Sequence, residues 1–271
     1  MNFNQLASGQ KRVNHAHRLV QIGILISLLW KISFFIYADR VYETISIQDS
    51  FFPDLLRSSI TLRTCFLGTI FCTVVNVFST NRSLQKSCNF GQLSGLSLLC
   101  LHQGTYNDMT FLTSWWCAVW AWWIGNRFDI DPPEELLKKA AFLARLIVSV
   151  IFLGGAVGKW TSEYWSGQVL YDIYFVDRDY WTFNYLRSNY NADQLKWLAL
   201  CYSRLVIILE TLAGFGLWLL KDRVAACLSI LLLTLIALSS NLLLFSVTGC
   251  LIALSSVGFL TIQPNLGRDQ D

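Results

Sequence analysis

The sequence predicts an all-α fold, a polytopic bundle of about eight membrane-spanning helices. Of the 271 residues, 54% are hydrophobic and only 14% are charged, whereas about a quarter are charged in an ordinary soluble domain. The mean hydropathy is +0.44. All four prolines lie outside the long apolar runs, which are therefore free to form continuous helices. These observations exclude a water-facing globule.

The apolar runs follow one another along the chain at about the length, roughly 20 residues, that crosses a bilayer. They lie near 19–37, 58–78, 90–105, 108–125, 140–158, 197–219, 224–240 and 241–262. The last two belong to one uncharged stretch that is too long for a single crossing, with Ser239-Ser240-Asn241 as the turn between them. Little sequence remains for a separate soluble domain, so residues 1–271 are expected to form one membrane domain.

The basic residues predict the orientation of the chain. An even number of spans places both termini on one side of the membrane. Eleven basic residues lie on that side and six on the other, so the positive-inside rule makes both termini cytoplasmic in a multi-pass protein of the cell membrane. The net charge of +3 is too small and too dispersed to indicate a nucleic-acid partner.

The eight cysteines indicate apolar packing, because seven of them lie in apolar segments and no C-x-x-C pair occurs. We therefore expect no metal site. The segment 160–196, placed on the outer face, has eleven aromatic residues among its 37. Tryptophan and tyrosine favour the headgroup level of a membrane, which explains the segment as an interface belt. The alternative is a lid over a lipid-like or quinone-like ligand.

Five charged residues remain inside the membrane after the loops are assigned: Lys31, Arg145, Lys159, Arg204 and Glu210. An unpaired charge at mid-membrane costs about 2.5 to 3.5 kcal/mol on insertion scales, so each is expected to reach the interface, pair or line a polar cavity. Lys159 and Arg145 are near helix ends and can reach the interface. Lys31, Arg204 and Glu210 lie deeper, and each either pairs with another helix or belongs to a functional polar site. Glu210 with Lys31 is the expected pair between helices.

The polar run from His102 to Asp108 interrupts the apolar sequence between the third and fourth spans. A tight turn between helices explains Gly104, Asn107 and Asp108 without any chemistry. The alternative is an active site that opens to the outer face, with His102 and Tyr106 near Lys159. A lysine that removes protons would need burial in an apolar pocket to lower its pKa.

The sequence around Lys159 resembles a known family. The run RLIVSVIFLGGAVGKW from Arg145 to Trp160, followed by Tyr164-Trp165-Ser166-Gly167, is similar to the membrane part of vitamin K-dependent gamma-carboxylases. More broadly, it resembles the horizontally transferred transmembrane (HTTM) domain. Glu210 with the following TLAGF, and Asn241 with Leu244-Phe245-Ser246, resemble later elements of this family.

The resemblance implies that Lys159 is the base that deprotonates a reduced quinone. It also marks His102, Tyr106, Trp160, Trp165, Glu210 and Asn241 as ligand-binding candidates. The chain departs from the carboxylases in four respects. Gly158 stands where they have a second lysine, and a histidine expected a few residues before Asn241 is replaced by apolar residues. Gly104 stands where their H-S-Y region has its histidine, with His102 offset by two, and the domain that binds the protein substrate has no counterpart here.

Three functions stay open at this point. The first is a non-carboxylating family member that holds a lipid or isoprenoid-quinone ligand near its outer face. The second is a quinone-dependent carboxylase-like lyase with Lys159 as base and a reduced quinone as cofactor. The third is a structural membrane subunit or a transporter whose polar residues only pair helices. The lipid bilayer is the partner common to all three.

Overall fold

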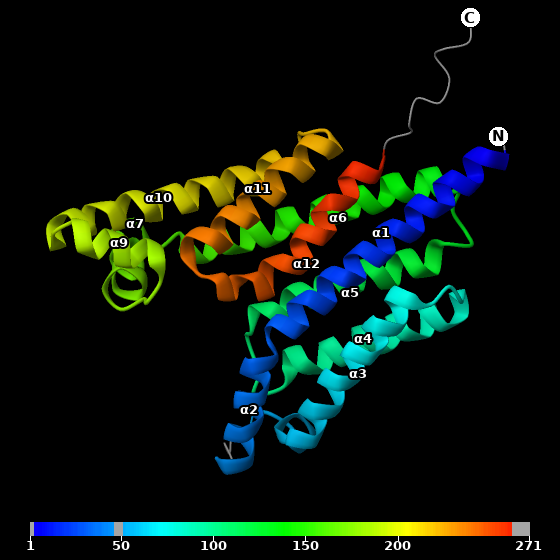
Figure 1. The fold of residues 1–271 in the computed structure, drawn as a ribbon, viewed down its shortest axis with the longest axis horizontal. Coiled ribbons are helices and arrows are strands. Elements are labelled where there is room, and N and C mark those ends of the chain that lie inside the picture. The colour runs from blue at the N-terminus through cyan, green and yellow to red at the C-terminus, as the bar shows by residue number, and fades with distance from the viewer. Residues whose placement is uncertain (1–2, 46–50, 262–271) are drawn as a thin grey trace, which may run out of the picture. The chain divides into compact units, whose positions relative to one another are not determined.

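A computed structural model describes residues 3–45 and 51–261 of the chain (Figure 1). The described residues form helices joined by turns, with no strand among them, which confirms the all-α prediction. The chain divides into two compact units, residues 1–144 with 245–271 (unit 1) and residues 145–244 (unit 2). The boundary between the units falls inside helix α6 (Pro133–Lys159).

Five helical segments are long and apolar enough to cross a membrane. They are α3 (Ser59–Phe78), α6, α10 (Ala192–Gly216), Asp222–Ser239 of α11 (Asp222–Ser240) and Leu242–Thr261. The last contains α12 (Phe245–Ser255) between two 3-10 segments, η3 (Leu242–Leu244) and η4 (Ser256–Thr261). A sixth is obtained when α1 (Phe3–Trp30) and α2 (Ile32–Thr44) count as one bent span.

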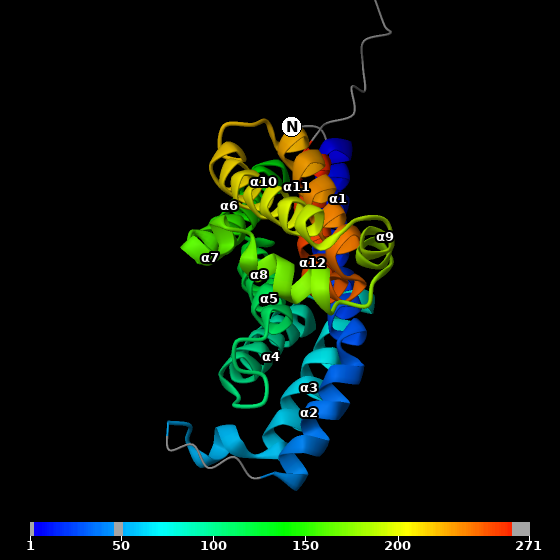
Figure 2. The same ribbon diagram turned by 90° about the vertical axis from the view of Figure 1, so that its left-hand side faces the viewer.

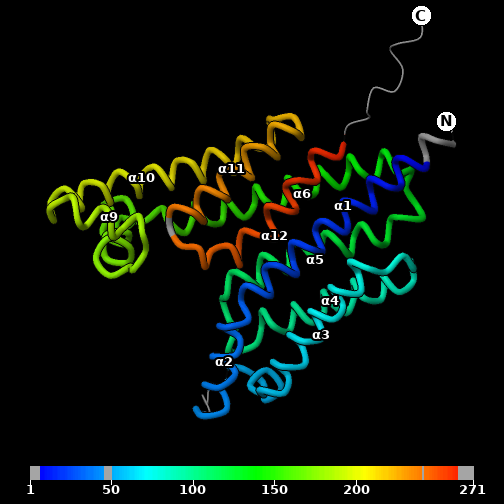
Figure 3. Tube along the Cα trace, viewed as in Figure 1, coloured from blue at the N-terminus to red at the C-terminus, as the bar shows by residue number. Residues whose placement is uncertain are grey.

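The run expected near 19–37 is therefore not straight. The chain bends by 50° between α1 and α2, and Figure 3 shows the change of direction. The break falls at Lys31, whose ammonium forms an ion pair with Asp108 of the turn after α4 (Arg82–Leu101). Helix α4 also differs from the expected run near 90–105. It begins at Arg82, because the side chain of Asn81 accepts hydrogen bonds from the backbone of Ser83 and Leu84.

In unit 1, α1 lies beside α12, and α4 lies between α3 and α5 (Met109–Arg127) (Figure 1). Small residues allow the close approach of α1 to α12. A Cβ atom on Gly23 would lie 2.4 Å from the Cβ of Ala253, so only glycine fits there. One turn along α1, the hydroxyl of Ser27 accepts a hydrogen bond of 2.9 Å from the backbone N–H of Cys250.

In unit 2, several short helices connect α6 to α10. They are α7 (Ser162–Trp165), α8 (Gln168–Leu170), the π-helical η2 (Tyr171–Val176) and α9 (Trp181–Asn189). Figure 2 shows them together at the N-terminal end of α10. Phe175 and Phe183 pack there against Leu195 and Ala199 of α10. Asn191 begins α10 with a reciprocal pair of hydrogen bonds to Gln194.

Candidate functional site

The centre of the candidate site in unit 2 is an ion pair between Lys159 and Glu210. The ammonium of Lys159 donates to the carboxylate Oε2 of Glu210 at 2.6 Å and to Oε1 at 2.9 Å. It also donates to the backbone carbonyl of Gly155 at 3.2 Å. The side chains are 25% and 11% exposed. Both were candidates from the sequence, and the structure places them in direct contact.

Helix geometry explains this contact. Lys159 is the last residue of α6, and helical side chains tilt toward the N-terminus of their helix. The Lys159 side chain therefore runs back over Gly155 instead of out to the interface. A Cβ atom on Gly155 would lie 3.1 Å from Glu210 Oε2 and 3.5 Å from Lys159 Nζ. The missing side chain thus makes room for the carboxylate.

Packing between α6 and α10 holds the two residues in register. A Cβ atom on Gly214 would lie 2.5 Å from side-chain atoms of Leu153, so the helices approach closely at this glycine. The hydroxyl of Ser149 donates to the carbonyl of Gly214. Closer to the N-terminal end of α6, Arg145 pairs with Asp222 at 3.3 Å and donates to the carbonyl of Leu220 at 2.5 Å.

The aromatic candidates Trp160 and Trp165 lie next to the ion pair in sequence and contact each other. Their rings meet edge to face, with centroids 5.1 Å apart. The indole N–H of Trp160 donates to the hydroxyl of Thr211, the residue after Glu210, at 3.3 Å. Arg204 Nε donates to the carbonyl of Trp165 at 3.3 Å. The structure thus connects both tryptophans to α10 near Glu210.

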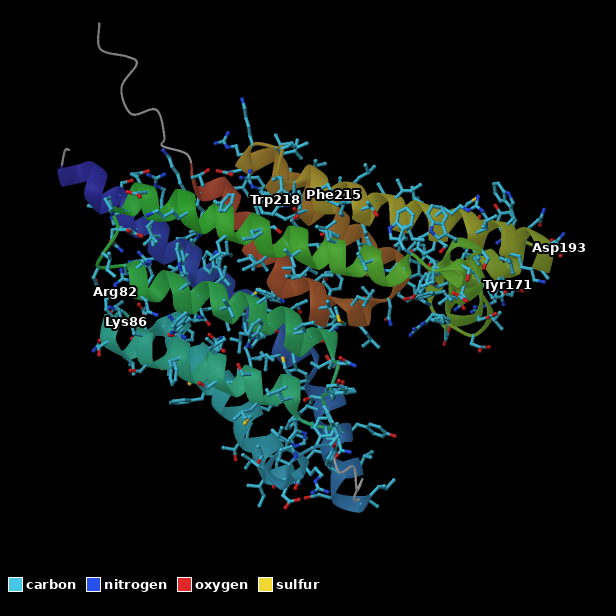
Figure 4. The ribbon with its side chains drawn as sticks, turned by 180° about the vertical axis from the view of Figure 1, so that it is seen from behind. Arg82, Lys86, Tyr171, Asp193, Phe215 and Trp218 are labelled. Carbon is cyan, nitrogen blue, oxygen red and sulfur yellow. The ribbon has the colours of Figure 1, made fainter. Side chains whose placement is uncertain are left out.

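An apolar groove runs along α10 past Glu210, with Leu209 before that residue and Leu212 after it in the lining. It lies between α10 and α11 and has a volume of about 220 Å³. Its lining has no charged residue: Leu209, Leu212, Ala213, Gly216, Leu217, Leu220, Leu228, Leu231 and Leu232. Figure 4 shows Phe215 near the C-terminal end of α10 and Trp218 just beyond that end, far along the helix from Asp193. A polar pair and an apolar groove are thus neighbours on one helix.

His102 and Tyr106 belong to unit 1. The ring of His102 is 1% exposed, and both nitrogens are bonded: Nδ1 accepts from the backbone N–H of Gly104 at 3.1 Å, and Nε2 lies 3.0 Å from the carbonyl of Ser58. Burial lowers the pKa of His102. The ring of Tyr106 is half exposed and meets Phe52 edge to face. These contacts agree with the interpretation of the run from His102 to Asp108 as a structural turn between helices.

Asn241, the remaining candidate, caps the turn that follows α11. Its side-chain oxygen accepts from the backbone N–H of Leu243 at 2.9 Å. Nearby carbonyl groups at the end of α11 accept hydrogen bonds from the start of α9. Tyr180 donates its hydroxyl to the carbonyl of Leu238, and Thr182 donates to that of Ser239. The aromatic segment 160–196 therefore touches the end of α11 as well as α10.

The expected pairing of Glu210 with Lys31 is wrong. The Lys31 ammonium lies 2.8 Å from a carboxylate oxygen of Asp108 and 4.1 Å from the ring centroid of Phe34, and Glu210 pairs with Lys159. In the sequence, Asp108 belongs to a turn between two spans, which does not indicate a partner for a charge inside the membrane. The bend at Lys31 places the two residues within reach of each other.

The sequence reasoning missed a cluster of buried amides in unit 1, here called the amide cluster: Gln21, Asn76, Asn89 and Gln92, with His17 and Thr73. All six side chains are 0 to 1% exposed. Asn89 Oδ1 accepts from Gln21 and Asn76 at 3.0 and 2.9 Å and lies 3.2 Å from His17 Nε2. The signal was in the sequence, because 17 and 21, 73 and 76, and 85, 89 and 92 repeat at helical spacing.

No family model matches the chain, and no curated protein and no solved structure matches it. Among the described residues, no group of three or more histidine, cysteine, aspartate or glutamate side chains could hold a metal ion.

Proposed function

We propose that the chain is a multi-pass cell-membrane protein of the HTTM, carboxylase-like family that holds a lipid or isoprenoid-quinone molecule in unit 2, near its outer face. The observation that carries the proposal is an apolar groove whose lining residues Leu209 and Leu212 flank Glu210 of the ion pair along α10. A lipid or an isoprenoid quinone has the matching two-part chemistry, with a polar head and a long apolar tail.

The size of the groove favours a chain-like ligand. Its volume of about 220 Å³ is below the roughly 300 to 1,000 Å³ of pockets that enclose a drug-sized molecule. A groove of that size fits a segment of an acyl or isoprenoid tail whose remainder lies in the bilayer. The ammonium and carboxylate of the ion pair, with the indole N–H of Trp160, supply polar groups for the head of the ligand.

Eight crossings are supported by the number of long helices. We count α4 and α5 as crossings in addition to the five or six apolar spans. Both are long enough, although α4 carries buried amides and α5 carries five tryptophans. Contacts of α4 with α3 and α5 bury its polar face, so both helices can cross without exposing amides to lipid. With eight crossings and the distribution of basic residues, both termini are cytoplasmic.

Catalysis by Lys159 as a base is the less favoured function. A base must be uncharged to accept a proton, whereas Glu210 provides a negative charge within hydrogen-bond distance of the ammonium. A quinol would first have to displace this carboxylate. In a purely structural protein, the same ion pair would only hold α6 and α10 together. The test must therefore distinguish the binding of a ligand from a purely structural role of the pair.

The test is native mass spectrometry of the full chain purified in its native lipids, with two matched variants. Leu212→Trp fills the groove, and Leu205→Trp places the same ring on α10 outside the groove; the two leucines are 63% and 52% exposed. We expect a bound lipid or quinone whose occupancy falls severalfold in Leu212→Trp alone.

Equal occupancy in the two variants, or no bound molecule beyond bulk phospholipid, would contradict the proposal. A bound quinone would lead to a second experiment, in which quinol-dependent turnover is compared between the unvaried chain and Lys159→Ala. Unchanged turnover in that variant would exclude Lys159 as the base.

A further inference from the structure

A group of positive charges lies at one end of unit 1, where α4 begins and α5 ends. Arg82 is the first residue of α4, and Lys86 follows one turn later (Figure 4). Arg18 on α1 is the last charged residue before the apolar run that starts at residue 19. These positions are at the boundary between the apolar part of the helices and the charged residues that flank it. In a membrane, this boundary lies in the headgroup region.

Arg82 is held in one orientation by neutral groups. Its guanidinium stacks on the ring of Phe128, 3.9 Å from the centroid. Nη2 donates to the side-chain oxygen of Asn14 at 2.5 Å, and Nη1 donates to that of Gln85 at 3.4 Å. A guanidinium has five N–H donors, so donors remain for another acceptor. None of these three contacts involves a carboxylate.

The neighbouring carboxylates are engaged by other basic groups. Lys86 forms an ion pair of 2.7 Å with Asp129, and Arg12 pairs with Glu134. The charge of Asp129 also attracts Arg82, but its hydrogen bond is to Lys86.

Arg18 is the second cation, and it forms no ion pair with a carboxylate of the described residues. Within residues 3–45 and 51–261, its Nε atom is buried and has no hydrogen-bond partner. Asn14, which accepts a hydrogen bond from Arg82, lies one helical turn before Arg18 on α1, so Arg82 and Arg18 are on the same side of that helix, and their charges repel each other. Two neighbouring cations whose nearest carboxylate, Asp129, is hydrogen-bonded to Lys86 are favoured when an anion from outside the chain lies between them.

We propose that Arg18 and Arg82 together bind the phosphate group of an anionic phospholipid. A phosphodiester in the headgroup layer is at the same level as the two guanidinium groups and accepts paired hydrogen bonds from them. Its negative charge compensates the repulsion. The phosphate of a zwitterionic lipid carries a cationic partner of its own, so an anionic headgroup such as phosphatidylglycerol is bound more tightly.

The experiment is native mass spectrometry of the full chain in detergent, titrated with phosphatidylglycerol or with phosphatidylcholine of the same acyl chains. Arg18→Gln is the principal variant, because Arg18 Nε makes no hydrogen bond within the described part of the chain. The matched control is Arg223→Gln, an exposed arginine in the first turn of α11. Thermal unfolding of each variant reports whether the fold is retained.

We expect the unvaried chain to bind phosphatidylglycerol about tenfold more tightly than phosphatidylcholine, a difference of about 1.4 kcal/mol. Arg18→Gln should remove that preference, and Arg223→Gln should keep it. Equal affinity of the unvaried chain for the two lipids would overturn the proposal, and this comparison does not depend on the folding of any variant. Retained preference in Arg18→Gln, or displacement of phosphatidylglycerol by inorganic phosphate, would also overturn it.

Discussion

Gln21 of α1 and Gln92 of α4 form hydrogen bonds to each other in both directions. The amide of Gln21 donates to Gln92 at 3.1 Å, and that of Gln92 donates to Gln21 at 2.8 Å. Gln92 also donates to the hydroxyl of Thr73 on α3 at 2.7 Å. Three helices of unit 1 are thus connected through one side chain. Because a bilayer offers no water to these groups, each amide depends on the others for its partners.

We predict that Gln92→Leu destabilises unit 1 by about 1 to 2 kcal/mol. The substitution removes the bonds to Gln21 and Thr73 and leaves buried polar groups without partners. The measurement is thermal unfolding of the purified protein in detergent. Gln10→Leu is the matched control, because the amide of Gln10 bonds only the neighbouring Asn14 of the same helix in the described contacts. Equal losses in the two variants would contradict the role of the cluster.

The sequence predicted the helices well where apolar runs were interrupted by charge or turn residues. The run near 58–78 corresponds to α3, and the run near 108–125 corresponds to α5. Helix α4 was placed too late because its first half is polar, and hydropathy alone does not show that Gln85 and Asn89 face other helices. A repeat of polar residues at helical spacing would have revealed this face.

The candidate site was predicted residue by residue but not as an arrangement. Lys159 and Glu210 were both singled out as charges inside the membrane, yet Glu210 was assigned to Lys31. Partner choice depends on which helices are neighbours, and hydropathy contains no such information. The bend between α1 and α2 that allows Lys31 to reach Asp108 has no proline or glycine signal in the sequence.

A second prediction concerns the ion pair. Lys159→Met leaves the Glu210 carboxylate, 11% exposed, without its cation, so we expect the free energy of unfolding to fall by about 1 to 3 kcal/mol. Glu210→Gln should have a smaller effect, since an amide oxygen still accepts from the ammonium. In the double variant Lys159→Met with Glu210→Gln, part of the loss should be recovered. Additive losses would show that the two side chains do not interact.

A third prediction concerns pH. Burial lowers the pKa of His102 below its ordinary value of 6.5, and the bond to the carbonyl of Ser58 offsets only part of this effect. Below about pH 6.5 the unfolded chain therefore binds more protons than the folded chain, so stability is lost as the pH falls. Melting temperatures measured between about pH 7.5 and 5.5 should fall, and less steeply in His102→Asn. An equal dependence of the melting temperature on pH in the unvaried chain and in His102→Asn would contradict this role of His102.

A fourth prediction tests the close approach of α6 and α10 in unit 2. Gly214→Ala places a methyl group about where Leu153 now lies, so the helices must move apart and the variant should unfold at a lower temperature. Gly154→Ala is the control on α6, because its Cβ would meet no atom within 4 Å and alanine favours the helix. It should be neutral or slightly stabilising. If both variants melt alike, the contact at Gly214 does not limit stability.

A fifth prediction tests the proposed orientation of α10. Tyr190 precedes this helix and Lys221 follows it, so a helix that crosses the membrane places them on opposite sides. With cytoplasmic termini, Tyr190→Cys should react with a membrane-impermeant maleimide added to intact cells, and Lys221→Cys should react only after permeabilisation. The eight native cysteines make the unvaried chain the control for background labelling. Reaction of both variants in intact cells would show that α10 does not cross, and the reverse pattern would invert the topology.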